Sequence, residues 1–182
     1  HVALWFAMFI MLLAGLINAI KYLRTHEYDY DIKSASFTKV AVLYGLLGLA
    51  TGSVWAKFTW NTFWTEDVKL NMTAVTILIY LAYLVLRSTF TDTDRRAKMS
   101  SAYNIFAFIA MIPLLFVIPR MTDSLHPGNG GNPALGGEDL DHTLRMFFYP
   151  SVIALALLGT WIAQLTIRYE RLREKILENL NE

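Results

Sequence analysis

Residues 40–56, VAVLYGLLGLATGSVWA, form an uncharged apolar stretch that decides the fold class of this chain. A helix needs roughly 20 apolar residues to cross about 30 Å of hydrocarbon. The stretch is apolar on all sides, unlike an alternating strand, and in lipid a single segment satisfies its backbone groups internally only as a helix. It therefore predicts one membrane-spanning helix.

Four further runs of the same kind lie before and after this stretch, and 55% of all residues are hydrophobic. The five runs cover residues 2–20, 40–56, 70–86, 99–119 and 146–167. They predict an all-α, polytopic helix bundle that forms a single membrane domain over residues 1–182. The expected helices span about 2–23, 37–56, 68–87, 101–119 and 145–167.

Charge and cysteine content exclude several classes of function. The formal net charge is only +1, so the chain has no basic footprint for nucleic acid. It contains no cysteine, which rules out thiolate metal sites and thiol catalysis. No acid–base pair, nucleophile triad or metalloprotease helix is recognisable, which favours a binding or transfer protein over a classical enzyme.

The basic residues predict the orientation in the membrane. Of the 16 Lys and Arg residues, twelve fall in the connectors after the first, third and fifth helices, which the positive-inside rule places in the cytoplasm. The four on the other side are Lys57, Lys69, Arg120 and Arg145. His1 then lies outside, and because neither an initiator Met nor a signal peptide precedes it, we expect a further helix upstream.

Residues 55–67, WAKFTWNTFWTED, connect the second and third helices on the outer side and hold three Trp and two Phe. An aromatic belt at the lipid headgroups accounts for one or two such rings. Five rings in so short a span, beside Lys57, Glu66 and Asp67, favour a binding platform. Trp60 and Trp64 are four residues apart and share one face if the loop forms a helical turn.

The remaining connectors have simpler interpretations. Asp67 stands at the foot of the third helix, where a carboxylate caps the first turn. The connector with His26 and Glu27 is expected to be a solvated cytoplasmic loop, and residues 88–100 a polar turn. The outward loop 120–143 is rich in glycine but matches no phosphate-binding motif. The cytoplasmic tail 168–182 continues a helical charge pattern.

Three histidines lie on the outer side with the aromatic platform, namely His1, His126 and His142. Neutral imidazole is a good ligand for haem iron. Two histidines near an aromatic platform could bind the iron from opposite faces, while outward cations such as Lys57 pair with the propionates. The sequence thus raises haem binding as a hypothesis.

Residues 55–71, WAKFTWNTFWTEDVKLN, resemble the tryptophan-rich "WWD" signature of the haem-handling proteins of cytochrome c biogenesis, W-G-K-P-T-W-G-T-W-W-V-W-D-A-R-L-T. Phe63 and Glu66 stand where that signature has Trp. The opening His1-Val2 is similar to the H-V-P of the family, and Ser124-Leu125-His126 resembles its second outward histidine. The matching residues are Trp55, Lys57, Thr59, Trp60, Thr62, Trp64, Asp67 and Leu70.

Chain length and helix number resemble the haem exporter protein C branch, also called cytochrome c maturation protein C, which has six helices. The resemblance implies that the chain binds haem b on the periplasmic face of the bacterial inner membrane and delivers it to a membrane-anchored haem chaperone, alongside subunits of an ATP-binding-cassette transporter. It implies His1 and His126 as axial ligands and leaves His142 without a role. The implied haem-binding residues are Trp55, Lys57, Trp60, Phe63, Trp64 and Asp67.

Two alternatives remain open at this point. The related cytochrome c synthase branch attaches haem to apocytochrome directly and is normally longer. A purely structural membrane protein, from another class, would use the tryptophans only to anchor helix ends in the lipid headgroups.

Overall fold

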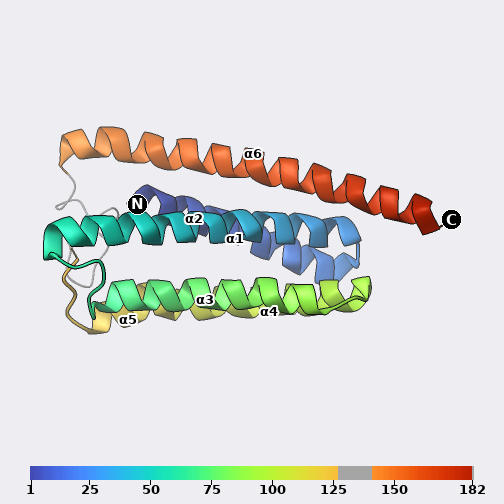
Figure 1. Ribbon diagram of the computed structural model, residues 1–182, viewed down its shortest axis with the longest axis horizontal. Helices are drawn as coiled ribbons and strands as arrows, with labels where there is room; N and C mark the ends of the chain where they lie inside the picture. The colour runs from blue at the N-terminus through green and yellow to red at the C-terminus, as the bar shows by residue number, and fades with distance from the viewer. Residues whose placement is uncertain (127–140, 182) are drawn as a thin grey trace.

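The computed structural model describes residues 1–126 and 141–181. The predicted loop 120–143 therefore lies mostly outside the described residues. The described chain is helical, and Figure 1 shows its long helices running side by side. The elements are α1 (Val2–Thr25), α2 (Tyr28–Trp60), α3 (Val68–Thr89), α4 (Thr93–Ile112), the π-helix η1 (Pro113–Val117), α5 (Ile118–Met121) and α6 (His142–Asn181).

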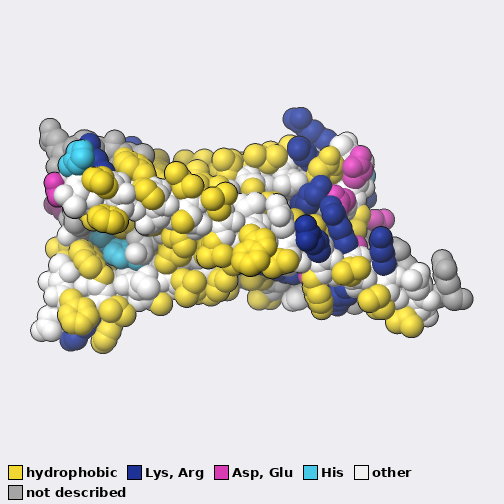
Figure 2. All heavy atoms as spheres, turned by 90° about the horizontal axis from the view of Figure 1, so that it is seen from above, with side chains coloured by type: hydrophobic (Ala, Val, Ile, Leu, Met, Phe, Trp, Pro, Cys, Tyr) yellow, Lys and Arg dark blue, Asp and Glu magenta, His cyan; other side chains and the backbone are white. Residues whose placement is uncertain are grey.

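Five helical segments of the described chain are long and apolar enough to cross a membrane, as predicted. They are α1, α2, α3, the α4–η1–α5 segment and α6. Apolar side chains also cover the outside of the middle of the molecule, where Leu78, Phe106 and Leu157 are each more than half exposed. Figure 2 shows this apolar band, with Lys and Arg side chains gathered towards one end. The chain is a multi-pass helical membrane protein.

The two ends of the bundle differ in chemistry. We call the end that carries Trp60, Asp67 and His126 the aromatic end, and the end that carries Asp31, Arg87 and Arg171 the basic end. Histidine side chains are visible at the aromatic end in Figure 2, opposite the main group of basic side chains.

The predicted solvated loop between the first two helices is wrong, because α2 begins at Tyr28 instead of residue 37. The connector shrinks to a tight turn at His26, whose φ of 57° is left-handed. Asp31 becomes buried, and its carboxylate receives two hydrogen bonds from the Arg87 guanidinium of α3, at 2.7 and 2.6 Å. Charges that suggest a loop in the sequence therefore neutralise each other inside the bundle.

Three further features of the later helices were not predicted. The helix expected from residue 101 starts at Thr93, where the Asp92 carboxylate accepts a hydrogen bond from the Arg95 amide at 2.6 Å. The same segment changes to a π-helix at Pro113, since proline lacks the N–H that an α-helix needs there. The last span and the tail form one helix, α6, joined to α2 at the basic end by the Arg171–Asp29 ion pair.

Close helix contacts in the interior depend on small residues. A Cβ atom placed on Gly15 of α1 would lie 2.8 Å from Thr38 Oγ1 of α2, and one on Gly48 would lie 3.0 Å from the Trp5 ring. Asn104 of α4 donates hydrogen bonds of 3.0 Å to both Thr38 and Ser34 in the same region. These contacts hold α1, α2 and α4 together.

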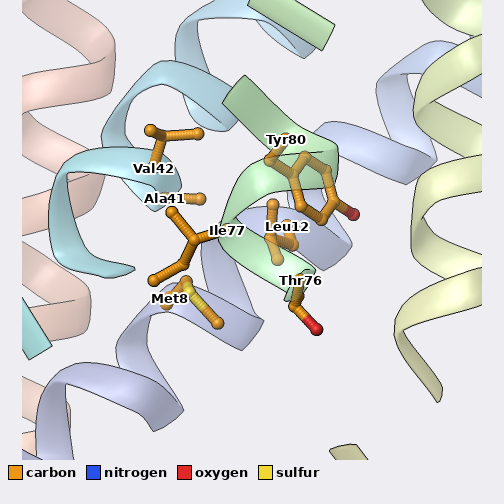
Figure 3. Close-up of a pocket in the computed structure, with 7 residues that line it drawn as sticks. All are labelled: Met8, Leu12, Ala41, Val42, Thr76, Ile77 and Tyr80. Atoms are coloured by element: carbon orange, nitrogen blue, oxygen red, sulfur yellow. The ribbon is translucent and has the colours of Figure 1, made fainter. Parts of the chain in front are cut away.

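A small gap remains between α1, α2 and α3 (Figure 3). It has room for about one water molecule. Its lining residues are Met8, Leu12, Ala41, Val42, Thr76, Ile77 and Tyr80. The gap lacks ionisable groups other than a tyrosine and is far too small for a macrocycle, so a ligand of that kind has to bind elsewhere.

Candidate functional site

Four segments that are distant in the sequence meet at the aromatic end. They are the start of α1, the end of α2 with its following loop, the start of α3 and the residues after α5, which Figure 1 shows at the same end of the bundle. The chain crosses the bundle twice between the start of α1 and the end of α2, and twice again between the start of α3 and the residues after α5. All four segments therefore lie at the same end. His1, Trp55, Trp60, Asp67 and His126 are thereby brought together.

The centre of this site is a cluster of four aromatic rings. Trp55 lies next to His1, with ring centroids 5.7 Å apart, and next to His126, at 6.0 Å. Trp60 contacts both Trp55, at 5.0 Å, and His126, at 4.9 Å, edge to face in each case. The two histidines implied as iron ligands thus share a tryptophan neighbour, although 125 positions separate them in the sequence.

The tryptophan-rich stretch is only partly a loop, which corrects the predicted boundary at residue 55. Helix α2 continues through Trp60 and ends at Asn61, whose φ is 58°. The Lys57 ammonium closes this end by donating to the Asn61 carbonyl at 3.0 Å, and it lies 5.7 Å from the centre of the Phe63 ring. Lys57 therefore supports the turn in this structure.

Trp60 and Trp64 do not share one helical turn, so the condition for a common face is not met. Trp64 follows the left-handed Asn61 and sits in the loop, where its indole N–H donates to Asn71 Oδ1 of α3 at 3.2 Å. Trp64 is 44% exposed and Phe63 58% exposed. Both rings are accessible at the aromatic end, but they are separate from the Trp55–Trp60 pair.

Asp67 is the N-cap of α3, as predicted, and its carboxylate side chain is fully buried. Its Oδ1 accepts hydrogen bonds from the amides of Lys69 and Leu70. Its Oδ2 accepts from Ser124 Oγ at 2.8 Å and from the Leu125 amide at 2.7 Å. The same carboxylate thus fixes the start of α3 and the residues that follow α5.

His126 completes this arrangement through its Nδ1 atom, which lies 2.8 Å from Asp67 Oδ1. Burial lowers the pKa of His126, although the Asp67 charge acts in the opposite direction. Burial acts to raise the pKa of Asp67, but hydrogen bonds from Ser124 and Leu125 and the charge of His126 lower it overall. With its proton on Nδ1, the imidazole donates a hydrogen bond to the Asp67 carboxylate, and its Nε2 carries the lone pair.

The other two histidines lie outside this arrangement. His142 begins α6 and is exposed. His26 ends α1 at the basic end, where it stacks edge to face with Tyr22. Within residues 1–126 and 141–181, His, Asp and Glu side chains form no group of three or more that could hold a bare metal ion. The donors gathered at the aromatic end instead suit an iron whose equatorial ligands come from a porphyrin.

The residues present fit such a group. Two imidazoles, one of them in contact with a buried carboxylate, lie beside a tryptophan pair at the aromatic end. The link from Asp67 to His126 and Ser124 was not predicted. The only signal for this link in the sequence is Asp67 itself. Its role as a helix cap already accounts for an acidic residue at that position.

Comparison with known proteins identifies a matching family. A family model described as CcmC, Heme exporter protein C, matches residues 1–181. The Heme exporter protein C of Bradyrhizobium diazoefficiens is 23% identical over 176 residues, which are 94% of this chain and 64% of the relative. That of Haemophilus influenzae is 29% identical over 104 residues, covering 54% of this chain and 42% of the relative.

A cytochrome c biogenesis protein with a different name also matches. The cytochrome c biogenesis protein CcsA of Prochlorococcus marinus is 31% identical over 85 residues, covering 47% of this chain and 27% of the relative. The matched part of the chain spans less than two thirds of each of these three relatives. By the family match over residues 1–181, this chain, whose described residues include five candidate membrane spans, belongs to the haem exporter protein C family.

Proposed function

We propose that this chain binds haem at the aromatic end through His1 and His126 and passes it on during cytochrome c maturation. The observation that carries the proposal is the shared neighbour Trp55, which lies within ring-contact distance of both histidines. Ligation by two histidines would need one imidazole on each face of the porphyrin, which supplies the other four ligands. Haem is the cargo here, and the residues serve to bind and orient it.

The aromatic residues have distinct roles in this proposal. Trp55 and Trp60 form a rigid edge-to-face pair beside His126, which holds that imidazole in place. Phe63 and Trp64 are exposed rings on which the macrocycle packs. Lys57 pairs with a propionate if it exchanges its hydrogen bond to Asn61 for a stronger charge-assisted one.

The orientation proposed from the basic residues puts the aromatic end in the periplasm of the bacterial inner membrane. A cysteine placed at Thr62, in this cysteine-free chain, should react with an impermeant maleimide on intact spheroplasts. A cysteine at Asp94, at the basic end, should react only after lysis. Strong labelling at residue 94 in intact cells would contradict this orientation.

The exposed rings of Phe63 and Trp64 suit a protein that hands haem to another protein, because a macrocycle packed on them is accessible to a partner. We propose a membrane-anchored haem chaperone as the recipient and components of the transporter of the maturation system as neighbours. The match to CcsA keeps haem attachment in the manner of a cytochrome c synthase as the second candidate. Incubation of the haem-loaded protein with chaperone or with apocytochrome, followed by detection of covalent haem, separates the two.

Haem titration of the purified protein tests the binding step. We expect the wild type to give a low-spin bis-histidine spectrum, and His126→Ala to lose or shift it. His26→Ala is the matched control, because His26 lies at the opposite end of α1 and should leave the spectrum unchanged. A wild type without a haem spectrum would refute the proposal and favour a purely anchoring role for the tryptophans. If His142→Ala removes the band and His126→Ala does not, the ligand assignment is wrong.

A further inference from the structure

The Asp67 carboxylate receives more hydrogen bonds than a helix cap requires. Two backbone amides of α3 already satisfy the capping role. Three additional contacts come from residues more than 50 positions away, namely the Ser124 hydroxyl, the Leu125 amide and the His126 ring. The side chain is fully buried, so these contacts replace solvent entirely.

We propose that Asp67 is a positioning residue for haem ligation, which holds His126 with Nδ1–H towards the carboxylate and Nε2 towards the iron. This inference rests on the proposed function. Asp67 does not contact haem in this role, which differs from the direct contact that the sequence resemblance implies. It acts through His126 alone.

The physical basis is that a hydrogen-bond acceptor on one nitrogen of an imidazole changes the properties of the other nitrogen, which binds the iron. An Nδ1–H bonded to a carboxylate fixes the tautomer and the ring orientation, and it raises the basicity of the ligating nitrogen. A more basic axial ligand stabilises ferric iron and lowers the reduction potential of the haem. The 2.8 Å contact in a buried site gives the Asp67 charge a strong influence on His126.

All five partners of Asp67 are donors once His126 carries its proton on Nδ1. An asparagine in this place would direct its NH₂ group at one of these donors, whichever way its amide is turned. Asp67→Asn therefore removes the charge and disturbs the network, even though it keeps one capping oxygen. The effect on His126 is expected to exceed the loss of a cap.

Asp92 provides a matched control, because it caps α4 at the basic end with a carboxylate that accepts the Arg95 amide. Asp67→Asn should weaken haem affinity by about 10- to 100-fold, as is usual when a partner of a metal ligand is lost, and should raise the reduction potential. Asp92→Asn should change neither. Both variants are measured by haem titration and spectroelectrochemistry in the same detergent.

Ser124→Ala tests the same inference with the opposite expected change in reduction potential. Loss of the Ser124 hydrogen bond leaves the Asp67 carboxylate more basic, so it should pull harder on the Nδ1–H and lower the potential. A purely structural role predicts no such opposite shifts for the two variants. If Asp67→Asn fails to fold, Ser124→Ala alone decides, and an unchanged or raised potential in that variant would overturn the inference.

The double variant His126→Ala, Asp67→Asn completes the cycle. With His126 absent, Asp67→Asn should leave the haem affinity unchanged relative to His126→Ala, together with the potential of any haem that stays bound. A persistent shift would mean that Asp67 acts on haem directly and would overturn the positioning role. An unchanged potential in Asp67→Asn, with a normal wild-type spectrum, would overturn only this inference, whereas a wild type that binds no haem would refute the proposed function as well.

Discussion

Trp60→Ala is the substitution that best tests whether the aromatic cluster is prearranged for haem. Trp60 is the last residue of α2, and its ring contacts Trp55 at 5.0 Å and His126 at 4.9 Å. The substitution removes both contacts without removing either histidine. His126 keeps its bond to Asp67 but loses the ring beside it.

The magnitude follows from the two edge-to-face contacts. Each aromatic pair contributes roughly 0.5–1.5 kcal/mol beyond its buried area, so the loss of two amounts to about 1–3 kcal/mol. If this stabilisation supports the binding-competent arrangement, the Kd for haem rises by about 5- to 150-fold. Trp60→Phe keeps a ring in place and should fall between Trp60→Ala and the wild type.

Haem titration followed at the Soret band measures the Kd of each variant in the same detergent. Phe58→Ala is the matched control, because Phe58 lies on the same turn of α2 and is 87% exposed. We expect its Kd to equal that of the wild type. Equal Kd values for Trp60→Ala and Phe58→Ala would refute the idea that the ring cluster prearranges the site.

Two further predictions concern the bundle itself. Arg87→Met should destabilise the protein by about 3–5 kcal/mol because it leaves the buried Asp31 carboxylate unpaired. The double variant Arg87→Met, Asp31→Leu should recover most of this loss. A thermal melt followed by tryptophan fluorescence measures both variants, and an Arg87→Met protein as stable as the wild type would contradict the pairing. Gly15→Ala should lower the melting temperature because its Cβ would meet Thr38 Oγ1 at 2.8 Å. Gly52→Ala should keep or raise the melting temperature, because its Cβ would make only ordinary contacts at 3.6 Å or more. Similar shifts for the two variants would argue against tight packing at Gly15.

The sequence predicted the helical class and the five spans because apolar runs of sufficient length have few other solutions in a membrane. It failed at the start of α2 because a sequence pattern records the charge of Asp31 but not its buried partner, Arg87. The start of α4 was missed for a similar reason, since its first two turns are polar yet still helical.

The sequence grouped several residues that the fold brings together, but it did not predict their geometry. The side of the membrane selected three outward histidines, and the family resemblance singled out His1 and His126, which lie beside Trp55 in the fold. The Asp67–His126 contact joins residues 59 positions apart through a short irregular segment, and no local periodicity encodes such a contact. The split of Trp60 from Trp64 depends on a single left-handed residue, which composition does not reveal.

The arrangement of Asp67 between α3 and the residues after α5 also sets an order of biosynthesis. Helices α1 and α2 make the most extensive pairing in the bundle and already place His1 beside Trp55. His126 joins them only after α3 and α4 have been inserted and Asp67 can hold the following residues. A nascent chain that ends before α5 thus carries only one of the two proposed ligands, and ligation by both histidines requires translation to continue past residue 126.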